Sequence, residues 1–119
     1  MCSEITSENA YKVFCVKEAH DEWNNLNEII REQFKGKLKE LVLNPDIPSK
    51  RLHSPLNGYY KIVLRRAGYR LVYEIVRSRV ILLVWTVGKR EDSEVYSTAQ
   101  KRLKDYKASD DDMIEIQVN

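Results

Sequence analysis

Between residues 59 and 87, the chain passes through three segments typical of strands, and in the first two the side chains alternate with a period of two. In the first segment, Tyr60, Ile62 and Leu64 fall on one face and the residues between them fall on the other. Short turns join the segments, and the last segment, 80–87, is apolar on both faces. This pattern predicts three antiparallel strands, with 80–87 as a central strand of the sheet.

A strand and two helices are predicted to precede this sheet. Residues 11–16 are rich in aromatic and β-branched side chains, which is typical of a strand. Ala19, Trp23 and Leu26 then recur with helical spacing, and Asn27 is placed to cap a second helix. The apolar stripe of the second helix consists of Ile30, Phe34, Leu38, Leu41 and Val42. The two helices are expected to form a hairpin.

A further helical pattern follows the sheet. Asp92 can cap this helix, whose apolar stripe consists of Val95, Ala99, Leu103 and Tyr106. The order strand, two helices, three strands, helix predicts a single α+β domain over residues 1–119, with the helical hairpin covering one face of a small, mainly antiparallel sheet. Residues 1–9 are polar and are expected to form a loose terminus.

The acidic tail at residues 108–119 has two interpretations. Three aspartates, 110–112, precede Ile114, Ile116 and Val118, which alternate as in an edge strand. One interpretation is a frayed acidic terminus. The other is a segment that pairs with an edge of the sheet or shields a basic surface.

Charge is distributed unevenly along the chain. The net charge is only +2, but residues 50–104 carry thirteen basic and four acidic side chains, a net charge of +9. Such a segment favours a polyanionic partner such as RNA or DNA. The alternative is a solvated basic surface without a partner.

The sequence lacks the motifs of several common kinds of catalytic and metal-binding site. The sequence has no histidine pair at catalytic spacing, no Gly-rich phosphate loop, no HExxH motif and no metal-binding carboxylate cluster. Cys2 and Cys15 form neither a metal-binding spacing nor a disulfide framework. No apolar run reaches the ~20 residues that cross a membrane, and the first residues lack the features of a secretory signal. We therefore expect a cytoplasmic protein that needs no metal and no cofactor.

RNA cleavage is a reaction that suits a cationic face without a metal. The ribose 2′-hydroxyl can attack the adjacent phosphate, and clustered Lys and Arg side chains stabilise the negative charge that develops. Cationic neighbours also lower a lysine pKa towards the range that suits proton transfer, and a tyrosine can stack on a base. Lys61, Arg65 and Arg70 are expected on such a face, and a structural network of ion pairs is the alternative.

The residues of this face carry a specific resemblance. Tyr60-Lys61-Ile62, Gly68 to Tyr73, and Gly88 to Tyr96 resemble the RelE toxins of the RelE/ParE superfamily, and the likeness covers about residues 11–104. The GYRLVY segment is common to the wider superfamily, whereas GKRE followed by SEVY is similar to the RelE branch itself. The resemblance implies a type II toxin that cleaves messenger RNA in the ribosomal decoding site by 2′-hydroxyl attack. Such a toxin inhibits translation and growth, and an antitoxin neutralises it.

The resemblance also implies roles for individual residues. Lys61 matches a catalytic lysine and Arg70 a phosphate-stabilising arginine. Arg90 matches a charge stabiliser or proton donor, and Tyr96 matches a residue that stacks on the base. The basic residues expected to contact the ribosome and RNA are Lys35, Lys37, Lys39, Lys50, Arg51, Arg65, Arg66 and Lys89.

One position departs from the family pattern. RelE toxins of this type carry a second lysine two residues after the first, on the same strand face, where this chain has Val63. Its absence removes a cation and a proton-transfer group from the site. We therefore expect a reduced rate or a changed division of roles, rather than a loss of activity.

The partners that the resemblance implies are a RelB-like antitoxin, the ribosome and messenger RNA, without a membrane. The toxin and antitoxin are expected to form a hetero-oligomer that binds operator DNA. Two other functions stay open. One is a ParE-like inhibitor of DNA gyrase on the same scaffold, and the other is a weakly catalytic or non-catalytic nucleic-acid-binding homologue.

Overall fold

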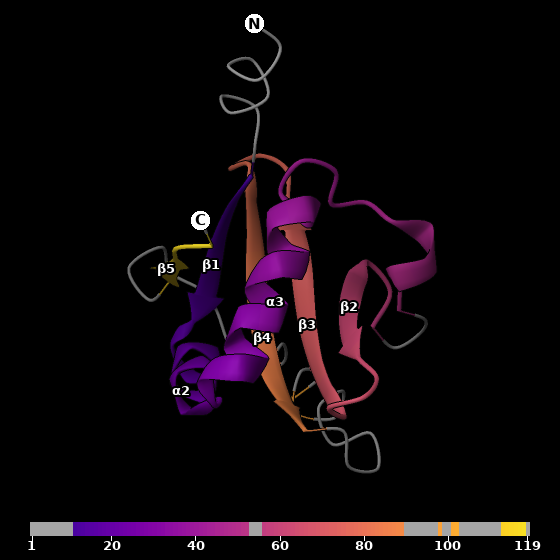
Figure 1. Ribbon diagram of the computed structural model, residues 1–119. Coiled ribbons are helices and arrows are strands. Elements are labelled where there is room, and N and C mark those ends of the chain that lie inside the picture. Colours follow the sequence, from indigo (N-terminus) through magenta and orange to yellow (C-terminus); the bar gives the residue numbers. More distant parts are fainter. Residues whose placement is uncertain (1–10, 53–55, 90–97, 99–100, 103–112, 119) are drawn as a thin grey trace, which may run out of the picture.

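The computed structural model describes residues 11–52, 56–89, 98, 101–102 and 113–118, which include a five-stranded sheet and two helices (Figure 1). The strands are β1 (Lys12–Val16), β2 (Tyr59–Leu64), β3 (Tyr69–Val76), β4 (Ile81–Lys89) and β5 (Met113–Ile116). The helices are α2 (Lys17–Asn25) and α3 (Glu28–Leu41), and a short 3-10 helix, Pro48–Lys50, lies in the loop before β2.

The strands are arranged in the order β2-β3-β4-β1-β5. β1 runs parallel to β4, and the other neighbouring strands are antiparallel. The consecutive β2, β3 and β4 confirm the three antiparallel strands predicted from the alternating pattern. β4 has a neighbour on each side and its first seven residues are buried, so the prediction of a central strand is also confirmed.

Both helices pack on one face of the sheet, and α3 crosses this face in front of the central strands (Figure 1). Asn27 caps α3 as predicted, because its side-chain oxygen accepts a hydrogen bond from the Ile30 backbone N–H at 2.9 Å. The predicted apolar stripe of α3 is buried, and the Phe34 ring lies 6.3 Å from that of Trp23 in α2. The helical hairpin on one sheet face is therefore confirmed.

The core lies between these helices and the sheet. Its largest fully buried side chains include Phe34 and Leu38 from α3, and Ile62, Leu71 and Tyr73 from β2 and β3. Full burial of an apolar side chain of this size contributes about 1.5–3 kcal/mol. This packing determines which side chains of each strand face the helices and which lie on the opposite face of the sheet.

β5 settles one question about the acidic tail. Met113–Ile116 pairs antiparallel with β1, and Ile116 is only 6% exposed and joins the core. The frayed-terminus interpretation is therefore wrong for these four residues, and the edge-strand interpretation is confirmed for them. β5 covers backbone groups of β1 that would otherwise form an open sheet edge.

Other terminal predictions lie largely outside the described residues. Residues 98, 101 and 102 have helical backbone, but the other positions of the predicted C-terminal helix and its Asp92 cap are not described. The same is true of residues 1–9. Within the described part of the chain, no helix combines the length and apolar character required to cross a membrane.

β4 is irregular near its middle. Val84 pairs with Tyr73 and Thr86 pairs with Val72, so Trp85 is an extra residue in this strand. The pairing of β4 with β1 on its other side ends at Val84, opposite Cys15. Beyond Val84, the β4 backbone on that side therefore needs other hydrogen-bond partners.

Candidate functional site

The sheet face opposite the helices carries Lys61 and Arg70. Buried and half-buried residues alternate along β2, which places Lys61 and Val63 on the face away from the core. Val63 lies directly across from Arg70, and Lys61 lies across from Val72. Lys61 and Arg70 are thus diagonal neighbours on adjacent strands, a placement that separates two residues by roughly 7–8 Å. Two of the four predicted catalytic residues therefore lie close together.

Arg70 is half-buried in a row of residues that crosses three strands. Val63 lies beside it on β2 and Gly88 lies beside it on β4. The Nε atom of Arg70 is shielded from solvent. Because Gly88 has no side chain, it adds no bulk next to the Arg70 side chain on this face.

A pocket of about 400 Å³ opens next to Val63 at the end of β2. It lies between α3 and the turn after β2, and its lining residues are Gln33, Lys37, Val63, Leu64, Arg65 and Arg66. Three of these residues are cationic and none is acidic. A concave surface lined by one sign of charge concentrates oppositely charged ligands, so this pocket favours an anion.

Lys50, in the short 3-10 helix before β2, interacts electrostatically with Lys37 of this pocket. Its pKa is lowered from the ordinary lysine value, because burial disfavours the charged form and because the Lys37 ammonium repels it. The structure therefore brings together three of the predicted RNA-binding residues at the pocket, Lys37, Arg65 and Arg66, and a fourth, Lys50, interacts with Lys37.

Lys35 and Lys39 lie on α3 in different surroundings. The Lys35 ammonium is 3.3 Å from the carboxylate of Glu32, one turn earlier on the helix. Lys39 is exposed near the end of the helix. An exposed ion pair of this kind contributes little to stability, but it reduces the local positive charge.

Lys89 lies across from Tyr69 at the end of β4. Its Nζ atom is 6.0 Å from the centre of the Tyr69 ring. Tyr69 alternates with Arg70 along β3, so Lys89 is directed to the opposite side of the sheet from Arg70. Lys89 is therefore separate from the pair formed by Lys61 and Arg70.

Arg51 is one of three residues that donate hydrogen bonds to Asp46 in the loop before β2. The Asp46 carboxylate accepts hydrogen bonds from the Tyr60 hydroxyl at 2.7 Å, from Arg51 at 2.9 Å and from Arg77 at 3.1 Å. These contacts, the Tyr60 hydrogen bond first, hold the pKa of Asp46 below its ordinary value. They tie the loop before β2 to the sheet, and they offset the Arg51 charge that the sequence assigned to RNA binding.

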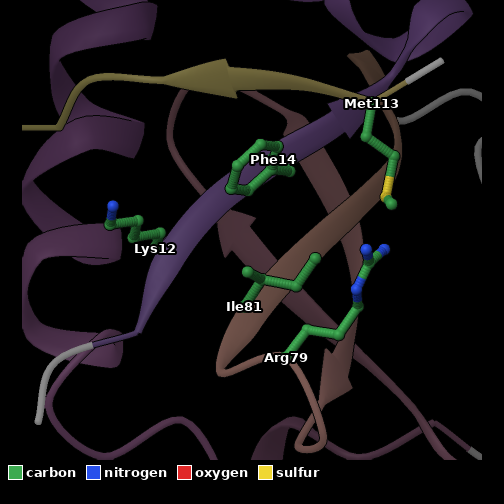
Figure 2. Close-up of a pocket in the computed structure, with 5 residues that line it drawn as sticks. All are labelled: Lys12, Phe14, Arg79, Ile81 and Met113. Atoms are coloured by element: carbon green, nitrogen blue, oxygen red, sulfur yellow. The ribbon is translucent and has the colours of Figure 1, made fainter. Parts of the chain in front are cut away.

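A second pocket lies near the opposite edge of the sheet. It has a volume of about 270 Å³, and its lining residues are Lys12, Phe14, Arg79, Ile81 and Met113 (Figure 2). Figure 2 shows the side chains of Arg79 and Met113 extending towards one another. β3 and β4 lie between β2 and β1, so this pocket is distant from Lys61.

Glu22 of α2 was not anticipated from the sequence as a site residue. Its Oε1 atom accepts hydrogen bonds from the Thr86 hydroxyl at 3.0 Å, the Val87 backbone N–H at 3.2 Å and Arg102 Nη1 at 2.9 Å. Its Oε2 atom accepts from Arg102 Nη2 at 3.0 Å, and Arg102 also donates to the Trp85 carbonyl at 3.0 Å. No local pattern indicates this cluster, because its partners lie 64 to 80 residues away from Glu22 in the sequence.

Two predicted catalytic residues, Arg90 and Tyr96, lie outside the described residues. Among the residues that are described, no three His, Cys, Asp or Glu side chains are grouped so that they could hold a metal ion. Of the four predicted catalytic residues, the structure describes Lys61 and Arg70.

The sequence matches a known class of proteins. Residues 14–94 match the family described as the ParE toxin of type II toxin-antitoxin systems, parDE. The chain therefore belongs to this toxin family of the RelE/ParE superfamily.

Within the superfamily, the chain is a RelE toxin by its relatives. It is 45% identical over 94 residues to the mRNA interferase toxin RelE of Escherichia coli K12, which covers 79% of this chain and 98% of that protein. It is equally similar, over the same shares, to the mRNA interferase RelE of Shigella flexneri. The family resemblance expected from the sequence is confirmed.

Solved structures agree with this assignment. Free E. coli RelE with two arginine-to-alanine substitutions has 44% sequence identity and a TM-score of 0.71, and the match covers 79% of this chain and 98% of that chain. The toxin in the intact E. coli RelBE toxin-antitoxin complex has 40% identity and a TM-score of 0.65, with coverage of 69% and 99%. β5 lies beyond residue 94, where the family match ends.

Proposed function

We propose that this protein is a type II toxin that cleaves messenger RNA on the ribosome and thereby inhibits translation and growth. One observation carries the proposal most directly: Lys61 and Arg70 lie diagonally on one sheet face of a RelE-family chain. Phosphodiester cleavage requires cations at the place where negative charge develops, and this face supplies them.

The proposed reaction breaks one phosphodiester bond without a metal ion. The 2′-oxygen attacks the adjacent phosphorus and loses its proton, the P–O5′ bond breaks, and the 5′-oxygen gains a proton. The products are a 2′,3′-cyclic phosphate and a 5′-hydroxyl. Because the nucleophile is part of the substrate, no metal-activated water is needed.

Lys61 and Arg70 take different parts in this proposal. An ammonium can exchange its proton, whereas a guanidinium rarely does, so Lys61 is assigned to proton transfer and Arg70 to charge stabilisation. Arg90 and Tyr96 complete the set through the family resemblance. Arg90 acts as a charge stabiliser or proton donor, and Tyr96 stacks on the base.

RNA phosphates are proposed to bind first at the cationic pocket. Lys37, Arg65 and Arg66 are supported by their grouping there, and Lys50 by its electrostatic interaction with Lys37. Lys39, exposed in the last turn of α3, and Lys89, at the end of β4, are proposed as further contacts to RNA or the ribosome. Lys35 and Arg51 are expected to contribute less, because Glu32 and Asp46 offset their charges.

The proposed partner in the resting state is a RelB-like antitoxin. Support comes from E. coli RelE bound to a peptide of its antitoxin RelB, which has 43% identity and a TM-score of 0.66 to this chain, and from the RelBE complex. The hetero-oligomer is expected to bind operator DNA. The proposed location is the cytoplasm, where ribosomes and messenger RNA are available.

The second candidate function is inhibition of DNA gyrase, which the ParE description of the matching family favours. Primer extension on messenger RNA after brief induction separates the candidates. Cuts phased with codons are expected from the wild type and from the control Lys17→Ala, but not from Lys61→Ala. DNA damage without such cuts would favour gyrase inhibition, and the absence of both effects would favour a non-catalytic nucleic-acid-binding protein.

A further inference from the structure

Glu22, Arg102 and Thr86 form a cluster beside the part of β4 that extends beyond the end of β1. β1 ends at Val16 and the chain enters α2 at once, so β4 continues past its partner. Glu22, on the second turn of α2, accepts the backbone N–H of Val87, and Arg102 donates to the backbone carbonyl of Trp85. Together these two side chains satisfy β4 backbone groups beyond the end of β1.

The contact between Glu22 and Arg102 differs from an ordinary surface ion pair. Each carboxylate oxygen of Glu22 accepts from one of the two terminal guanidinium nitrogens of Arg102. The side chain of Glu22 is only 33% exposed and that of Arg102 only 19%. Bidentate geometry fixes direction as well as distance. The additional hydrogen bonds to Thr86 and Val87 hold the carboxylate in place, so the pair defines where Arg102 lies relative to β4.

The proposed catalytic residues are linked to this cluster through β4 and through the chain that follows it. Val87 is followed by Gly88, which lies beside Arg70, and by Lys89 at the end of β4. The chain from Lys89 to Arg102 contains Arg90 and Tyr96. The cluster therefore fixes the end of β4 and the position of Arg102 against it.

We propose that Glu22 and Arg102 are positioning residues for RNA cleavage, which act by fixing the end of β4 and the C-terminal helical residues against α2. This inference rests on the proposed function, because it assigns the reaction to the Lys61 and Arg70 face. Neither side chain is assigned a contact with RNA. Their loss should slow the chemical step and leave RNA and ribosome binding largely intact.

The test compares two neighbouring cations in a ribosome-dependent cleavage assay. Arg102→Gln removes the bidentate contact, whereas Lys101→Gln removes the same charge from an exposed neighbour. Arg102→Gln should lower kcat by about tenfold or more, towards the ~100-fold loss that a misplacement of about 1 Å can cause, with KM for programmed ribosomes nearly unchanged. Arg102→Lys should fall between Arg102→Gln and the wild type, and Lys101→Gln should match the wild type.

A melting curve for each variant separates positioning from unfolding. A folded Arg102→Gln protein with wild-type kcat would overturn the inference, as would an equal loss in Lys101→Gln. If Arg102→Gln does not fold, Arg102→Lys decides, because one ammonium cannot reach both carboxylate oxygens and the Trp85 carbonyl in the same geometry. A folded lysine variant with wild-type kcat would then contradict the positioning role.

Lys61→Ala in the same assay keeps the two proposals apart. If Lys61→Ala cleaves as fast as the wild type, the proposed site is wrong. If Lys61→Ala is impaired and a folded Arg102→Gln is not, the site stands and only the positioning role fails.

Discussion

Val63 lies across from Arg70 and two residues after Lys61 on the same face of β2. The resemblance to RelE toxins implies a lysine there, so the proposed site of this chain has one ammonium fewer than expected. In the proposed reaction, charge stabilisation then depends on Arg70 and on the cations of the pocket next to Val63.

A Val63→Lys variant should cleave ribosome-bound messenger RNA faster than the wild type, at least severalfold. The new ammonium would lie beside Arg70, where it can stabilise the phosphorane or transfer a proton. Single-turnover rates measure this directly, and Val63→Leu serves as the uncharged control. Equal rates for wild type and Val63→Lys would show that the departure has no catalytic consequence.

Asp46 makes acid stability depend on the loop before β2. Its pKa is lowered in the folded protein, chiefly by the Tyr60 hydrogen bond and then by Arg51. The resulting stabilisation is fully present above the ordinary aspartate pKa of about 4, and it is lost as pH falls through the lower pKa of the folded state.

Asp46→Asn should therefore lower the melting temperature at neutral pH and weaken the loss of stability below about pH 4. Melting curves of wild type and variant between pH 7 and pH 2 provide the measurement. Parallel pH dependences in the two proteins would contradict the assigned role of Asp46.

Single residues were predictable from the sequence where their partners are local. The Asn27 cap bonds a residue three positions away, and the placement of Lys61 follows from alternation within one strand. Asp46 also bonds Tyr60 and Arg77, 14 and 31 residues away, and the partners of Glu22 lie 64 to 80 residues away. No local pattern could reveal these contacts. The grouping of Lys37 with Arg65 and Arg66 likewise depends on how α3 lies relative to β2.

Among the secondary-structure elements, those with long periodic patterns were predicted best. The alternation in β2 and β3 and the apolar run of β4 are long enough to identify these segments as strands. The apolar stripe of α3 likewise identifies it as a helix. β5 has only four residues, too few for its alternation to exclude a frayed terminus. The extra residue at Trp85 arises from pairing with β3, which a single strand cannot indicate.

The role of β5 in the core can be tested by two adjacent substitutions. Ile116→Ala should reduce the free energy of unfolding by about 2 kcal/mol or more, because Ile116 is buried against β1. Glu115→Ala, at an exposed position of the same strand, should change it by no more than about 0.5 kcal/mol. Urea unfolding gives both values. Equal, small effects would show that β5 does not contribute to the core.

Over the whole molecule, the fold brings together basic residues that lie in different parts of the sequence. Lys37 comes from the acidic first half of the chain, yet it lies with Arg65 and Arg66 of the basic segment at one pocket. β1 pairs with β4, so β2 and β3, which carry Lys61 and Arg70, lie on the other side of β4 from β1. The charge asymmetry predicted a polyanionic partner, but only the packing of α3 against the sheet shows which of the cations lie together.

The most direct test of the proposed function is the cleavage rate of messenger RNA on programmed ribosomes under single-turnover conditions. Lys61→Ala and Arg70→Ala should each lower this rate by at least about 100-fold, which is typical for loss of a proton-transfer or charge-stabilising group, while Lys17→Ala should retain the wild-type rate. Wild-type rates in folded Lys61→Ala and Arg70→Ala proteins, or no cleavage by the wild type itself, would contradict the assignment of RNA cleavage to this face of the sheet.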